Sequence, residues 1–108
     1  MPIRVGEPDA GGEVALAPDG VLEIALPENA STGYRWELEP LPPGAEQVGD
    51  RMEAAASAPP GAAGLRVFAV RFSGGGTVSA RLRRPWEQVE PVRRFSVRVS
   101  APAAGTPR

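Results

Sequence analysis

The chain has 108 residues with a formal net charge of −1, no cysteine and no histidine, and all 12 of its basic residues are arginine. This length fits one domain with a core that needs no disulfide bonds. Without cysteine, histidine or lysine, the chain lacks a thiol nucleophile, thiolate metal ligands and the commonest general bases. We therefore expect no enzymatic activity, no catalytic residue, no metal site and no cofactor.

The charge and hydropathy of the chain also argue against two classes of partner. The nearly balanced charge provides no electrostatic footprint for nucleic acid. No apolar run approaches the roughly 20 residues needed to span a bilayer, so we expect no membrane partner. Residues 1–12 are polar and glycine-rich and lack the apolar stretch of a signal peptide. The expected location is the cytoplasm or, for a mature exported form, outside it.

Apolar residues at every second position predict a series of short, half-buried strands. In chain order these cover residues 13–17, 21–26, 34–38, 47–52, 65–72, 77–83 and 94–100. The pattern at 47–52 is the weakest. The run at 65–72 is apolar on both faces, which predicts a central strand. Residues 73–76 are typical of a tight hairpin turn between that strand and the next.

About seven short strands with no convincing helix predict an all-β fold. The polar, solvent-exposed face of each strand favours an antiparallel β-sandwich. A five-stranded barrel is the structural alternative. We expect one domain over residues 1–108, with its core at about 14–100. The ends at 1–12 and 101–108 are expected to be flexible.

Three connections between the predicted strands carry candidate binding residues. The first contains Asn29, Ala30, Ser31, Thr32, Gly33 and Tyr34, although small polar residues and glycine also suit an ordinary turn. The second ends in Gly61, Ala62, Ala63 and Gly64, and the third contains Arg84, Pro85 and Trp86. Trp86 lies outside the strand alternation, so it is either an exposed aromatic anchor or a tryptophan folded over the sandwich end. Three such connections at one end of a sandwich would form a wedge.

In this order, the three motifs resemble those of the chagasin-like inhibitors of papain-family cysteine peptidases, peptidase inhibitor family I42. The family's motifs are asparagine-proline-threonine-threonine-glycine-aromatic, glycine-x-glycine-glycine and arginine-proline-tryptophan. The similarity covers roughly Val14 to Val99 and includes Trp36. Residues 61–64 match the second motif better than 74–76, because two strands separate the family's glycine motif from its arginine-proline-tryptophan motif.

The resemblance implies an immunoglobulin-like sandwich that inhibits a papain-family cysteine peptidase reversibly and competitively. It implies that all residues of the three motifs bind the peptidase as a wedge, with Ser31 and Thr32 at the catalytic centre and Trp86 to one side. Ala30 stands where the family has proline, Ser31 where it has threonine, and Ala63 where it has glycine. We expect a monomer when free. The alternative is a non-inhibitory immunoglobulin-like module that binds protein or carbohydrate.

Overall fold

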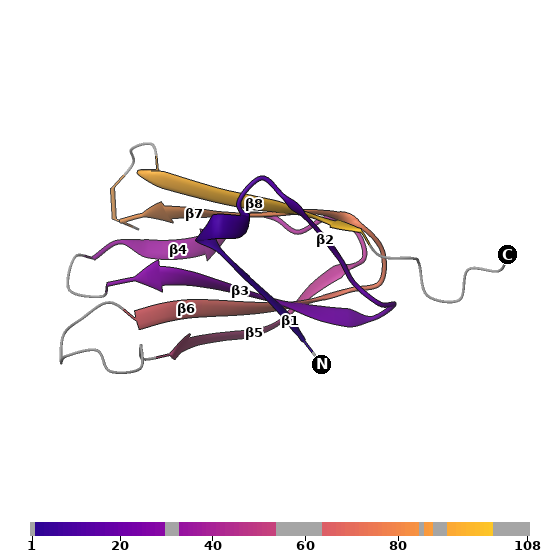
Figure 1. Ribbon diagram of the computed structural model, residues 1–108. Coiled ribbons are helices and arrows are strands. Elements are labelled where there is room, and N and C mark those ends of the chain that lie inside the picture. The colour runs from indigo at the N-terminus through magenta and orange to yellow at the C-terminus, as the bar shows by residue number, and fades with distance from the viewer. Residues whose placement is uncertain (1, 30–32, 54–63, 85, 88–90, 101–108) are drawn as a thin grey trace, which may run out of the picture.

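The alternating strands fold into two four-stranded sheets that pack face to face (Figure 1). The computed structural model describes residues 2–29, 33–53, 64–84, 86–87 and 91–100. The first sheet has the order β1 (Ile3–Gly6), β3 (Gly20–Glu28), β6 (Gly64–Phe72) and β5 (Ala45–Glu53). The second has the order β2 (Glu13–Ala15), β8 (Arg93–Ser100), β7 (Gly76–Arg83) and β4 (Arg35–Leu38). The fold is therefore an immunoglobulin-like β-sandwich, as expected, and not a barrel.

The core lies between the sheets and follows the period-two pattern of the sequence. Trp36 of β4 is its largest fully buried side chain, with 1% of its surface exposed. The other fully buried apolar side chains that pack in this cluster are Leu22, Ile24, Leu26, Val70, Phe72, Val78, Ala80, Val97 and Val99. As predicted, β6 is an interior strand, and its outward-facing Val67 is buried as well.

The N-terminal region differs from the expectation of a flexible end at residues 1–12. Ile3–Gly6 form β1, which runs parallel to β3, and the helical turn η1 (Glu7–Asp9) follows. In the register, Ile3 lies beside Leu22 and Val5 beside Ile24. A parallel edge strand pairs with residues far along the chain, so the local sequence pattern gave no sign of it. The expected flexible end at 101–108 lies outside the described residues.

Two other strand predictions need correction. The predicted hairpin turn at 73–76 is wrong, because β6 and β7 lie in different sheets and the connection crosses between them. The amide of Ser73 donates to the carbonyl of Gly44 at 2.8 Å, which ties this crossing to the start of β5. The weak strand predicted at 47–52 is longer, from Ala45 to Glu53, and has an irregular register between Gln47 and Gly49.

The strand count and directions also go beyond the prediction of about seven antiparallel strands. Eight strands are present in the described residues, and both β1 with β3 and β2 with β8 pair in parallel. The remaining strand pairs are antiparallel. No helix in the part of the chain that the structure describes is long and apolar enough to cross a membrane.

Candidate functional site

The three connections singled out from the sequence leave and re-enter the sandwich at one end. Because β3 pairs antiparallel with β6, Glu28 at the end of β3 lies opposite Gly64 at the start of β6. Because β4 pairs antiparallel with β7, Arg35 lies opposite Arg83. The connections β3–β4, β5–β6 and β7–β8 therefore share this end, on the left in Figure 1. We call it the loop end.

Trp86 projects from the loop end and is held there by the first connection. Trp86 is 68% exposed, which makes it the most exposed of the large apolar residues in the described part of the chain. Its indole ring packs on Gly33, where an added Cβ atom would lie 2.5 Å from Cη2 of Trp86. Gly33 also has φ of +82°, a conformation that favours glycine. The predicted exposure of Trp86 is confirmed, and its role as a binding anchor stays a prediction. The positive φ and the ring above it both favour glycine at position 33.

A second contact joins the same two connections. The guanidinium carbon of Arg84 lies 4.4 Å from the centroid of the Tyr34 ring, within the range of a cation–π interaction. Arg84 also pairs with Glu87, with Nη1 and Oε2 3.5 Å apart. The amide of Glu87 donates to the carbonyl of Arg84 at 3.0 Å, which closes a turn around Trp86. The first and third connections thus present one joint surface.

The base of the first connection is closed by a buried carboxylate that the sequence analysis missed. Glu28 is 4% exposed, and its Oε1 accepts a 2.7 Å hydrogen bond from the amide of Trp36. The Trp36 indole Nε1 donates to the carbonyl of Pro27 at 2.8 Å. Arg66 pairs with Glu28 at 3.2 Å. A signal existed, because Glu28 and Arg66 occupy positions with the same parity as the core residues of their strands.

The same arginine extends the contact to a third strand. Arg66 Nη2 donates to Asp50 Oδ2 of β5 at 2.8 Å. This hydrogen bond holds the pKa of the Asp50 carboxyl below its usual value. Arg66 also lies over the ring of Phe68, 5.0 Å from its centroid. A line of polar contacts therefore crosses the base of the loop end from β4 to β5.

The structure describes part of the candidate set. It places Asn29, Gly33, Tyr34, Gly64, Arg84 and Trp86 at the loop end. The other candidates, Ala30, Ser31, Thr32, Gly61, Ala62, Ala63 and Pro85, lie outside the described residues. No group of three histidine, cysteine, aspartate or glutamate residues in the described ranges could hold a metal ion.

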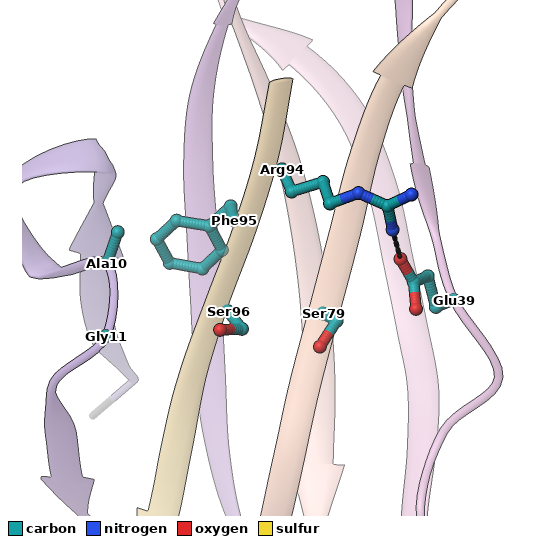
Figure 2. A pocket seen from close by; sticks show the side chains of 7 residues that line it. All are labelled: Ala10, Gly11, Glu39, Ser79, Arg94, Phe95 and Ser96. Carbon is teal, nitrogen blue, oxygen red and sulfur yellow. Dashed lines mark hydrogen bonds and ion pairs between the residues drawn. The ribbon is translucent and has the colours of Figure 1, made fainter. Parts of the chain in front are cut away.

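A hollow of about 260 Å³ lies away from the loop end, on the face of the second sheet (Figure 2). Its lining residues are Ala10, Gly11, Glu39, Ser79, Arg94, Phe95 and Ser96. Figure 2 shows Arg94 reaching from β8 toward Glu39, with Nη1 and Oε2 3.4 Å apart. None of the candidate binding residues that the structure describes lines this hollow.

Comparison with known proteins places the chain in a family. A sequence model described as the chagasin family peptidase inhibitor I42 matches residues 16–99, which is most of the chain. The chain belongs to the chagasin family. Members of this family are peptidase inhibitors, so this chagasin-family protein is an inhibitor and not an enzyme. No curated protein matches its sequence.

Among the solved structures that share the fold of this chagasin-family protein, two are described by their similarity to this chain. One is the cysteine protease inhibitor EhICP2 from Entamoeba histolytica, with a TM-score of 0.80 and 22% identity over 93% of this chain and 94% of that one. The other is amebosin, with a TM-score of 0.73 and 24% identity over 92% of this chain and 96% of that one. At these identities the likeness establishes the sandwich fold.

Proposed function

We propose that this chagasin-family protein is a reversible, competitive inhibitor of papain-like cysteine peptidases and that its loop end enters the active-site cleft. Membership of a peptidase-inhibitor family supports the general activity. The similar structure from Entamoeba histolytica is a cysteine protease inhibitor, which supports this class of target. The observation that carries the proposal is the exposed Trp86, held on Gly33 where the first and third connections meet.

The geometry of the loop end suits a cleft between two walls. A tryptophan is costly to leave exposed and is among the residues that contribute most to protein interfaces. Its packing on Gly33 and the Arg84–Tyr34 contact hold the first and third connections together before binding, which lowers the ordering cost. In the proposed complex, Trp86 packs on one cleft wall, and residues 61–64 lie along the other.

The remaining candidates complete the wedge. Ser31 and Thr32 face the catalytic cysteine and histidine of the peptidase, and Asn29, Ala30, Gly33 and Tyr34 shape the loop that carries them. Arg84 and Pro85 support Trp86. An interface of about 1,600 Å² in total would be ordinary for such a complex. Because the wedge fills the cleft without offering a bond for cleavage, substrate is excluded and the inhibitor dissociates intact.

The proposal is tested by titrating papain and cathepsin L with this protein in the presence of a fluorogenic peptide substrate. We expect the apparent inhibition constant to rise linearly with substrate concentration and activity to return on dilution. Trp86→Ala should weaken inhibition by about 30-fold or more, which corresponds to about 2 kcal/mol or more.

The matched control is Val48→Ala, which truncates another exposed apolar side chain, on β5. This variant should inhibit as the unaltered protein does. Inhibition that does not depend on substrate concentration, or that survives Trp86→Ala unchanged, would contradict the proposed mechanism.

A further inference from the structure

Two neighbouring strands carry a charged residue on their core-facing side at the loop end. The core-facing stripe of β3 is Leu22, Ile24 and Leu26, and the next position of the same parity is Glu28. The corresponding stripe of β6 is Phe72, Val70 and Phe68, and the next position toward the loop end is Arg66. The apolar core is thus closed at this end by an ion pair instead of further apolar side chains.

The Glu28 carboxylate connects the two sheets. Glu28 belongs to the first sheet, and the Trp36 amide that donates to it at 2.7 Å belongs to β4 of the second sheet. β4 is the last strand in the order of its sheet. The Trp36 amide is therefore paired by a side chain where an edge strand would otherwise leave a donor unsatisfied.

This contact also joins the two ends of the first connection. Glu28 is the last residue of β3 and Trp36 is the second residue of β4, so the hydrogen bond closes the chain segment that carries Asn29 to Tyr34. The second bond, from Trp36 Nε1 to the Pro27 carbonyl, repeats the closure one residue further back. Together they fix the distance between the two ends of the first connection.

Arg66 links the contact between Glu28 and Trp36 to the strands that flank the second connection. It lies two residues after Gly64, where β6 begins, and pairs with Glu28 through Nη1 at 3.2 Å. Its other nitrogen atoms bond to Asp50, which lies three residues before the end of β5 at Glu53. Both strands that flank the second connection are thus tied to the carboxylate that closes the first.

A buried ion pair is seldom worth much net stability, because desolvation offsets most of the attraction between the charges. Its hydrogen-bond directions nevertheless restrict the geometry of the groups that it joins. We propose that Glu28 is a positioning residue for inhibition: its carboxylate holds the first connection in its binding shape and, through Arg66, sets the second beside it. This inference rests on the proposed function, since it concerns the affinity of the same loop end.

The test compares three variants in the papain titration, together with thermal unfolding. Glu28→Ala removes both the acceptor and the charge, and we expect its inhibition constant to rise by about tenfold or more. Glu28→Gln keeps an oxygen that can accept from the Trp36 amide, so it should restore inhibition to within about threefold. The control Glu23→Ala removes a carboxylate of the same strand that pairs with Arg4 at 2.9 Å, on the opposite face. It should inhibit normally.

Amide hydrogen exchange of the free protein provides a reading that needs no peptidase. In Glu28→Ala, the amide of Trp36 should exchange faster by at least tenfold, because its acceptor is lost, while that of Val97 in the core keeps its protection. If the unaltered protein fails to inhibit but exchange changes in this way, Glu28 still holds the ends of the first connection together, and it is the proposed function that fails. Unchanged exchange at Trp36, equal inhibition by Glu28→Ala, or an equal loss in Glu23→Ala would overturn the positioning role.

Discussion

At the scale of single residues, Gly33 and Trp86 show how the loop end is assembled. The indole ring occupies the space that a side chain at Gly33 would need, and the backbone there has positive φ. The position of Trp86 outside the strand alternation left its exposure as one of two alternatives. The contact of Trp86 with Gly33 could not be predicted, because the two residues belong to different connections that meet only in the folded chain.

Gly33→Ala should therefore damage the loop end in two ways. Positive φ in a residue with a Cβ atom costs roughly 1–2 kcal/mol, and the new methyl group displaces the Trp86 ring. We expect a loss of stability of that size in urea denaturation. We also expect stronger quenching of tryptophan fluorescence by iodide, which reads Trp86 because Trp36 is buried.

Gly74→Ala is the control for this substitution, since nothing lies within 4 Å of a Cβ atom at that position. Its stability should change by less than about 0.5 kcal/mol, with unaltered quenching. A Gly33→Ala protein that matches the unaltered chain in both measurements would show that the ring does not depend on this glycine.

At the scale of strands and sheets, the outer face of the first sheet carries a network of paired charges. Arg4 of β1 pairs with Glu23 of β3 and with Glu53 of β5, both at 2.9 Å, and Arg51 pairs with the same two carboxylates. Arg51 lies directly opposite Val67 in the register, and Val67 is buried on this outward face. The charged network therefore lies on the outward face of the same sheet as β6, the interior strand that is apolar on both of its faces.

This network predicts how stability depends on pH. Hydrogen bonds from Arg4 and then from Arg51 lower the pKa of Glu53 from 4.5 to about 2. A carboxylate with a lowered folded-state pKa stabilises the fold above its unfolded pKa, and this contribution is lost as protons bind. The melting temperature should therefore decrease as the pH is lowered from about 5 to about 2. Glu53→Gln should make the melting temperature depend less on pH over this range.

Glu46→Gln serves as the comparison, because Glu46 is largely exposed and Arg71, at 3.3 Å, is its one ion-pair partner among the described residues. It should keep the pH dependence of the unaltered protein. Added salt should weaken the effect of Glu53, since these charges are accessible to solvent. A Glu53→Gln protein with an unchanged pH profile would contradict the role assigned to the network.

The strands themselves show what a sequence pattern can and cannot reveal. Period-two alternation was sufficient for β3, β6, β7 and β8, because each has one clearly apolar face. It missed β1, which is short and pairs in parallel with a distant segment. It also took the glycine-rich residues 73–76 for a hairpin, since the composition of a turn does not reveal which sheet the next strand joins.

At the scale of the whole molecule, the antiparallel pairings bring three connections far apart in sequence to one end of the sandwich. The order of the motifs in the sequence was enough to suggest the family, and the family model now establishes it. The arrangement of these motifs in space could not be predicted without the register of the strands. Nor could the hydrogen bond that joins the buried Glu28 to the opposite sheet.

The measurement that tests this account most directly is binding of the protein to papain before and after the cleft is filled by a covalent peptidyl inhibitor. Surface plasmon resonance would report both cases with the same immobilised peptidase. The account predicts clear binding to the open enzyme and its loss once the cleft is filled, because the loop end occupies that space. Equal binding to the open and the filled enzyme would contradict the wedge and place the contact elsewhere.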